Sequence, residues 1–347
     1  MKRVVSSSDV ISQLRLPLIV LVTYAHSYGA VAEGYRLLFS PWDTCEVLRL
    51  LVSQTLVKVA VPVFFIISGY LFFARVGQWS MAVYRQKMGR RVKSLLVPYV
   101  VWNLLMAAKL HRCSWDVLWD CVARAGMQTD WLGRENWMTA PADMPLWFLR
   151  DLMVVSLLTP IIYILLRRFG TVVMGLLTVV YLSGVGAFAL PGLSMYAVYF
   201  FSLGAFLGIR RLDLVATAVR YRVPAYVLTL LLAWLMMVAY GTGLFSPLML
   251  CFRLTGAVAT LALAASVLRR TSRRLPPRVV GSSYVLYLAH YVLFMSFIDA
   301  AFFRVFGTSA ASCSLHYLLC PLVKAGLIVG AYMAVRRMVE WGYRKVS

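Results

Sequence analysis

The chain has 347 residues, of which 61% are hydrophobic and only 14% are charged. This composition, with a mean hydropathy of +0.78, excludes an ordinary soluble domain and indicates a polytopic membrane protein. The formal net charge of +22 does not predict binding to nucleic acid, because the basic residues form short clusters between apolar runs. Anionic lipids of the cytoplasmic leaflet are the expected partners of those clusters.

Apolar runs separated by charged or Gly/Pro-containing breaks predict an all-α protein with ten transmembrane helices. We expect one membrane-embedded domain over residues 1–347, with no separate soluble domain and no cleavable signal peptide. The basic stretch 75–93 is expected to be a loop. The predicted spans are 14–33, 48–73, 94–110, 146–166, two between Arg168 and Arg210 that separate at Pro191–Gly192, two between 223 and 268 that separate at Gly241–Gly243 and Pro247, 279–298, and 314–335.

The distribution of lysine and arginine supports this count and orients it. With both termini in the cytoplasm, the inward segments carry 23 of these residues and the outward loops carry only six. A missed or extra span would invert every later loop and remove this contrast. The pattern therefore predicts ten spans with both termini cytoplasmic.

Two ionisable residues stand out in the first span, Arg15 and His26. Between Arg15 and Glu33 lie 17 residues without a formal charge when His26 is neutral. At about 100° and 1.5 Å per residue, the step from Arg15 to His26 places both side chains on one helix face, about 16 Å apart along the axis. An ionisable group as deep as His26 is costly in a membrane, so its presence predicts a function.

The longest outward segment, 111–145, combines four tryptophans with five carboxylates, and it is interpreted as a lid or interfacial helix or, alternatively, as a sugar-binding surface. The six cysteines show no metal-ligand spacing, so we expect no metal and no bound cofactor. Four cysteines lie in or beside outward segments, where a disulfide and simple packing both remain open, namely Cys45, Cys113, Cys121 and Cys313.

Five stretches, in chain order, resemble the acyltransferase-3 superfamily of membrane O-acyltransferases. They are Arg15-x10-His26, VPVFFIISGYLFF (61–73), RRVKSLLVPYVVWN (90–103), PLWFLRDL (145–152) and SSYVLYLAHYVLF (282–294). Many members carry Arg-x-x-Arg before the third helix. Here Arg91 fits the first position, Ser94 holds the second, and Lys93 stands beside it.

The resemblance implies transfer of an acyl group, usually acetyl from acetyl-CoA, to a hydroxyl of a cell-envelope glycan or its lipid-linked precursor. It also implies a place in the bacterial cytoplasmic (inner) membrane. The chain is similar to the minimal members that decorate surface polysaccharides, which lack a fused extracytoplasmic domain.

The residues are compatible with that chemistry. The phosphates of a cytosolic acyl-CoA need basic groups at the inner face, which Arg15, Arg91 and Lys93 would supply as donor-binding residues. The thioester lies at the end of a long arm, so the catalytic group should be deep in the membrane, as His26 is. His26 is predicted to be catalytic, either as a general base or as a nucleophile that carries the acyl group.

The remaining polar residues are weaker candidates for the site, and some of them keep two interpretations. His290 is a site residue or an interhelical hydrogen-bonding residue, and Arg150 with Asp151 forms either an acceptor site or a local ion pair. Ser68–Gly69 is interpreted as close helix packing, since no Gly-x-Ser-x-Gly elbow surrounds the serine. His111 and His316 are expected at the membrane interface without chemistry. Three cations within apolar runs predict a water-filled interior and have no assigned partners, namely Lys58, Arg253 and Lys324.

The alternative function is a transporter or flippase of glycans or lipids, whose ionisable residues would line a pathway. Such proteins often contain inverted repeats with paired broken helices, and the sequence shows neither. A catalytically inactive assembly subunit of a polysaccharide pathway is also compatible with the sequence. Transfer or hydrolysis of a labelled acetyl group by the purified protein separates an enzyme from these readings.

Overall fold

In the computed structural model, the described part of the chain is almost entirely helical. The structure describes residues 6–27, 44–109, 128–129, 135–136, 143–184, 192–271, 273–293 and 296–346. Within these ranges the strands are one antiparallel pair of two residues each, β1 (Gln128–Thr129) and β2 (Glu135–Asn136). The predicted all-α class is confirmed for these residues.

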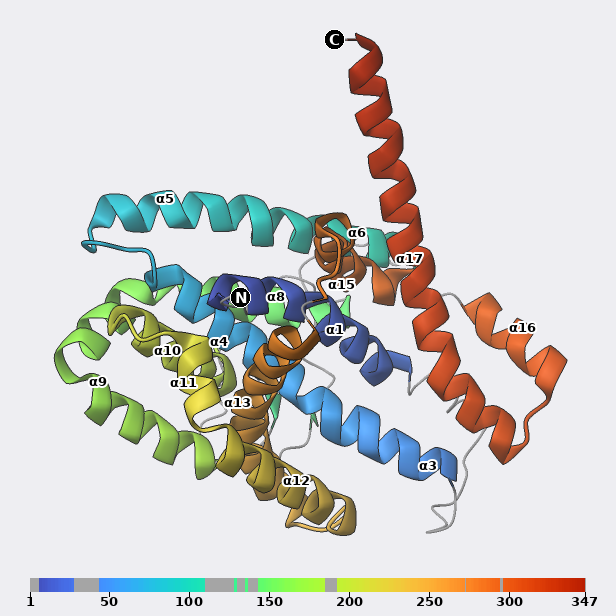
Figure 1. The fold of residues 1–347 in the computed structure, drawn as a ribbon, viewed down its shortest axis with the longest axis horizontal. Helices are drawn as coiled ribbons and strands as arrows, with labels where there is room; N and C mark the ends of the chain where they lie inside the picture. Colours follow the sequence, from blue (N-terminus) through green and yellow to red (C-terminus); the bar gives the residue numbers. More distant parts are fainter. Residues whose placement is uncertain are drawn as a thin grey trace. The chain divides into compact units, whose positions relative to one another are not determined.

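The chain divides into two compact units, which we name the terminal unit (Met1–Ala60 and Val267–Ser347) and the central unit (Val61–Ser266). In the terminal unit, α16 folds back beside α17 (Figure 1). The helices of the terminal unit are α1 (Ser7–Ser27), α3 (Thr44–Arg49), the π-helix η1 (Leu50–Thr55), the 3-10 helix η2 (Leu56–Val59), α14 (Pro277–Gly281), α15 (Ser283–Val292), α16 (Ser296–Phe306) and α17 (Ala310–Val346).

The central unit contains the remaining described helices, and α9 packs along α10 within it. Its first helix begins at Ala60 and its last continues to Thr271. The helices are α4 (Ala60–Phe73), α5 (Met81–Arg91), the π-helix η3 (Val92–Leu96), α6 (Val97–Lys109), the 3-10 helix η5 (Met144–Leu146), α8 (Trp147–Leu157), α9 (Thr159–Leu182), α10 (Met195–Ile209), α11 (Leu214–Arg220), α12 (Arg222–Val238) and α13 (Phe245–Thr271).

Among the described residues, six helical stretches are long and apolar enough to cross a membrane, and the number rises to eight if each of two bent helix pairs is one span. The bent pairs are α11 with α12 and α15 with α16, each with a bend of 73°. The shorter helix α10 is also apolar. A multi-pass membrane protein is therefore supported, while the ten spans and their orientation stay predictions.

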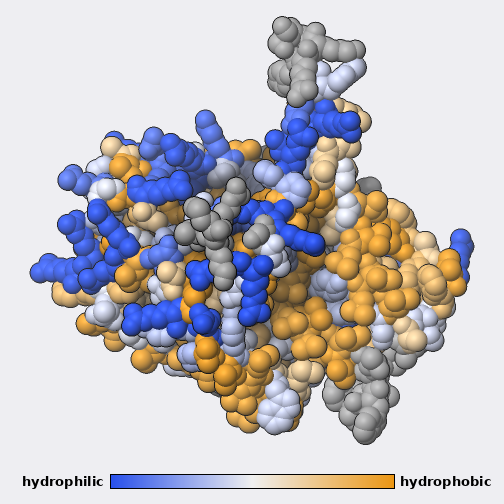
Figure 2. Space-filling model, viewed as in Figure 1, coloured by the Kyte–Doolittle hydropathy of each residue, from blue (hydrophilic) through white to orange (hydrophobic). Residues whose placement is uncertain are grey.

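The exposed surface of the central unit fits a lipid environment. On α12, Val223, Val227, Leu230, Trp234 and Val238 are each at least 60% exposed and recur at helical spacing. Figure 2 shows the corresponding apolar surface over α12. A soluble helix would present polar residues on such a face, so α12 is suited to contact acyl chains.

Two local predictions were wrong. The basic stretch 75–93, expected as a loop, contains helix α5, because Ser80 accepts a hydrogen bond from the Val83 N–H and good helix formers follow it. The predicted span 146–166 is broken between α8 and α9, where Pro160 occupies the first turn of the new helix. Proline lacks the N–H that would continue a helix but suits its first turn.

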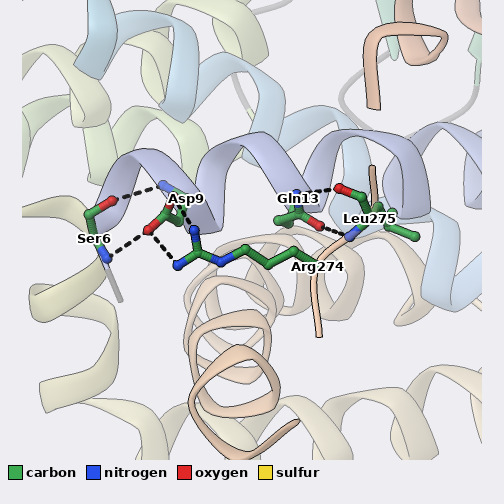
Figure 3. Close-up of polar contacts among 5 residues, drawn as sticks. All are labelled: Ser6, Asp9, Gln13, Arg274 and Leu275. Carbon is green, nitrogen blue, oxygen red and sulfur yellow. Dashed lines mark hydrogen bonds and ion pairs between the residues drawn. The ribbon is translucent and has the colours of Figure 1, made fainter. Parts of the chain in front are cut away.

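The beginning of α1 is fixed by a polar cluster (Figure 3). The Ser6 hydroxyl accepts a hydrogen bond from the Asp9 N–H, and the Asp9 carboxylate accepts one from the Ser6 N–H, which forms a capping box. Both guanidinium Nη atoms of Arg274 donate to the Asp9 carboxylate at 3.0 and 3.2 Å. The Gln13 amide exchanges two hydrogen bonds with the Leu275 backbone. These contacts hold the helix that carries Arg15 and His26 in a defined register.

Helices α4 and α10 approach each other with their backbones in contact. A Cβ atom at Gly69 would overlap the Phe201 carbonyl, and one at Gly204 would overlap the Ile66 carbonyl. The prediction that Ser68–Gly69 serves close helix packing is confirmed. Small residues at such crossings are the usual means by which membrane helices approach closely.

Replacement of Gly204 by alanine tests this contact. The added methyl group meets backbone atoms that cannot move aside, so we expect loss of monodisperse protein in size-exclusion chromatography from detergent. Gly175→Ala is the matched control, because a Cβ at Gly175 has open space within 4 Å. A Gly204→Ala protein as stable as the Gly175→Ala protein would contradict the packing.

Candidate active site

His26 lies near the end of α1, and α15 packs beside it. The ring centroids of His26 and His290 are 5.3 Å apart, and those of His26 and Tyr291 are 5.5 Å apart with the rings nearly perpendicular. The structure thus brings together the catalytic candidate from the first span and the histidine of the YLAHY stretch. Two imidazoles and a phenol at one place within an apolar unit can accept and donate protons.

The backbone fixes the tautomer of His290. Its Nδ1 atom lies 2.7 Å from the Tyr287 carbonyl oxygen, and a carbonyl can only accept, so Nδ1 carries the proton. In the neutral ring, Nε2 then holds a lone pair, and it is buried without a hydrogen-bond partner in the described part of the chain. This arrangement is typical of histidines that act as bases or support one.

A hydrogen-bond network holds the turn of α1 that precedes His26. The Ser53 hydroxyl donates to the Tyr24 carbonyl oxygen at 2.8 Å and lies 2.6 Å from the Tyr317 hydroxyl. The Tyr24 hydroxyl donates to the Leu318 carbonyl at 2.8 Å. The last carbonyls of a helix lack partners within it, so Ser53 satisfies one of them from a neighbouring segment.

This network was not predicted from the sequence. A serine and a tyrosine within apolar runs were the available signal, because such polar side chains need hydrogen-bond partners when they are buried. Ser53 lies on the π-helical segment η1, which the 3-10 segment η2 follows directly. Both segments pack against α1. Such irregular turns within a long helix are frequent at functional sites, and their φ/ψ changes leave no periodic mark in the sequence.

Arg15 lies on the same helix as His26 and is exposed. No hydrogen bond or ion pair joins it to another described residue. Pro17 lies between the two, so the helix lacks one backbone hydrogen bond there. An exposed guanidinium in this position can bind an anion.

Arg91 and Lys93 lie in the central unit, and they differ. Arg91 is half-buried, and its guanidinium donates to the Ser156 hydroxyl at 2.7 Å and the Ser68 hydroxyl at 2.9 Å. It also lies over the Phe72 ring, 4.9 Å from the centroid. Lys93 is exposed on the π-helical segment η3. Arg91 therefore joins its segment to α4 and α8, whereas Lys93 has an exposed charge.

Arg150 and Asp151 are buried at the start of α8 and lie 3.5 Å apart, so the local ion pair is present. The second Asp151 oxygen accepts a hydrogen bond from the Ser194 hydroxyl at 2.6 Å. Gly192 has φ of +77°, and a Cβ atom there would meet Val154 at 2.7 Å. Gly192 thus allows the chain to pass close to α8, while Pro191 lies outside the described residues.

A second buried carboxyl, Asp143, precedes η5. Its backbone N–H donates to the Asn103 side-chain oxygen at 3.0 Å. Burial raises the pKa of the Asp143 carboxyl to about 8, against the opposing effect of Lys109, so this acid is largely protonated at neutral pH. Nothing in the sequence singles it out among the five carboxylates of its segment.

Asp299, His316 and Lys324 form a buried cluster between α16 and α17. The Asp299 oxygens lie 2.8 Å from the His316 Nε2 and 2.7 Å from the Lys324 ammonium. Lys324 thus has a partner, and His316 is buried against Asp299, while its expected place at the membrane interface stays a prediction. The ligand atoms of Asp299, His316 and Cys320 lie within 4.8 Å of one another, but the Lys324 ammonium already neutralises the carboxylate. We therefore assign no metal to this cluster.

Of the other named residues, Arg253 is buried in α13 with its guanidinium 4.9 Å from the centroid of the Tyr196 ring. Cys45 and Cys313 are buried. His111, Cys113, Cys121 and the four tryptophans of 111–145 lie outside the described residues, so their predictions stand as made.

Comparison with known proteins places the chain among acyl-transferring enzymes. A family model described as an acyltransferase domain (Acyl_transf_3) matches residues 10–323. The succinoglycan biosynthesis protein ExoH of Rhizobium meliloti (strain 1021) is 25% identical over 308 residues, which cover 84% of this chain and 79% of that protein. No solved structure matches significantly.

Replacement of Tyr317 by phenylalanine tests whether the Ser53 network positions His26. The change removes one buried hydrogen bond, worth about 0.5–1.5 kcal/mol, and should lower the turnover number of the purified protein up to about tenfold. The Michaelis constant for the donor should stay unchanged, because the network does not contact it. Tyr332→Phe on the same helix is the control. A fall in melting temperature at unchanged turnover would mean that the network only stabilises the fold.

Proposed function

The chain belongs to the acyltransferase-3 family and is an acyltransferase, and on that premise we propose that it is a membrane O-acyltransferase acting on a cell-envelope glycan or lipid-linked saccharide. The proposed donor is an acyl-CoA, with acetyl-CoA as the first candidate. The relative ExoH is named for biosynthesis of a polysaccharide, which favours a glycan acceptor. The proposal gains its main support from the grouping of His26, His290 and Tyr291 in one unit.

The proposed reaction joins the acceptor oxygen to the acyl carbon. The hydroxyl oxygen attacks the thioester carbonyl while His26 takes the hydroxyl proton, and the carbonyl electrons move onto its oxygen. When the carbonyl re-forms, the C–S bond breaks and the leaving CoA thiolate takes the proton from His26. A route through an acyl-histidine uses the same residue as a nucleophile and also passes through an oxyanion. Rapid-quench detection of labelled protein separates the two routes.

Three basic residues are proposed to bind the donor. Arg15 offers an exposed guanidinium on the helix of His26, and Lys93 offers an exposed ammonium on η3, which follows the basic helix α5. Arg91 is anchored to two serine hydroxyls, so it would present only its remaining N–H groups to a phosphate. His290, Arg150 and Asp151 are proposed to support the acceptor.

The proposed location is the bacterial cytoplasmic (inner) membrane, with ten spans and both termini in the cytoplasm. The contrast of 23 inward and six outward lysine and arginine residues supports this orientation. Anionic lipids are the proposed partners of the basic clusters, among them α5, which carries the basic residues Arg85, Lys87, Arg90 and Arg91.

Replacement of His26 by alanine tests the proposed chemistry. Loss of a general base lowers turnover by about 10²–10⁴-fold, so acyl transfer from labelled acetyl-CoA should fall near the background. The variant should remain folded, which size-exclusion chromatography in detergent checks. Activity within about threefold of wild type at equal protein would remove His26 from the mechanism.

Replacement of Arg15 by lysine separates donor binding from anchoring. Lysine keeps the charge and the long stem of an anchor but loses the planar fork that binds two phosphate oxygens. A charge-assisted hydrogen bond is worth about 1.5–3 kcal/mol, so the donor Michaelis constant should rise about tenfold to a hundredfold. Arg15→Ala should be worse than lysine.

The measurement is a donor titration at saturating acceptor in nanodiscs, and the acceptor constant serves as the internal control. An unchanged donor constant with normal turnover would show that Arg15 only anchors α1. The phosphate site would then have to be sought at Lys93 and Arg91.

A further inference from the structure

Lys58 is a cation for which the proposed mechanism has so far given no role. It lies within the candidate span Cys45–Phe73, which has a mean hydropathy of 2.1 over its most apolar window. An ionisable side chain inside such a span is costly and usually marks a pathway or a reaction site. Lys58 lies on a segment that packs against the helix of His26, which favours a reaction site over a pathway.

The segment that carries Lys58 is fixed against the helix of His26. Lys58 belongs to η2, which packs against α1, as does the preceding η1. Ser53 bonds the Tyr24 carbonyl, two residues before His26, so the irregular segment has one register on that turn. The Tyr317 hydroxyl, 2.6 Å from Ser53, holds the same contact from α17.

The Lys58 charge acts on the His26 ring through space. A cation held at a reaction site in an apolar unit stabilises negative charge that develops during the reaction.

We propose that the Lys58 ammonium contacts the carbonyl oxygen of the acyl group and stabilises the oxyanion formed at His26. The proposal rests on the acyl transfer described above. When the acceptor oxygen bonds to the acyl carbon, the carbonyl electron pair becomes a negative charge on oxygen, and Lys58 pairs with that charge without giving up a proton. When the electron pair returns, the C–S bond breaks, the thiolate takes its proton from His26, and Lys58 is unchanged. Lys58 is thus a catalytic residue that acts on the transition state.

The decisive variant is Lys58→Met, which keeps the apolar stem and removes the charge. Loss of one oxyanion donor costs about 10²–10³-fold in turnover, and we expect this loss with a donor Michaelis constant unchanged within about threefold. Lys58→Arg should recover part of the loss and Lys58→Gln should not, because only arginine keeps the charge. Arg304→Met, an exposed cation of the same unit, is the matched control and should keep wild-type turnover.

The outcomes separate this inference from the proposed function. If wild-type protein transfers no acyl group, or His26→Ala remains active, the proposed function fails. If both behave as expected but Lys58→Met keeps turnover within about threefold, the Lys58 inference alone is overturned. A raised donor constant at normal turnover also overturns it, because Lys58 would then bind the donor in its ground state. If the Lys58→Met protein does not fold, the other two variants decide. Equal turnover of Lys58→Arg and Lys58→Gln would then overturn the Lys58 inference, because only arginine keeps the charge.

Discussion

The hydroxyl of Ser53, placed between the Tyr24 carbonyl and the Tyr317 hydroxyl, is the interaction on which the candidate site depends. Little water competes for these hydrogen bonds in an apolar unit, so a missing partner would leave a costly unsatisfied group. The same bonds set the register of η1 and η2 on α1. They thereby determine which side chains lie beside His26. They also connect three elements, α1, η1 and α17.

Part of this arrangement follows from the sequence. Charged residues are costly in lipid, so apolar runs and their breaks predicted the all-α class. The depth of His26 marked it as functional, and the structure places it beside His290. Gly69 was predicted to serve close packing because glycine lets two backbones meet, and it does so against Phe201. Each of these inferences depends on composition or on local spacing, which a single sequence records.

Other features depend on contacts between distant residues and could not be predicted. Lys324 pairs with Asp299, and Arg91 donates to Ser68 and Ser156, but no spacing within one helix reveals either partner. Helix α5 was mistaken for a loop because its basic residues suggested solvent, although arginine, lysine and glutamine favour helices. The π-helical turns could not be predicted either, because they are short and have no residue signature of their own.

The account makes one central claim, that the chain joins an acyl group to a glycan hydroxyl. The most direct test supplies purified protein in nanodiscs with acyl-CoA and the acceptor glycan and measures both products together. The account predicts that free CoA thiol appears in equal amount to glycan carrying the added mass of the acyl group, as determined by mass spectrometry. Glycan that gains no mass, with no thiol released, would contradict it.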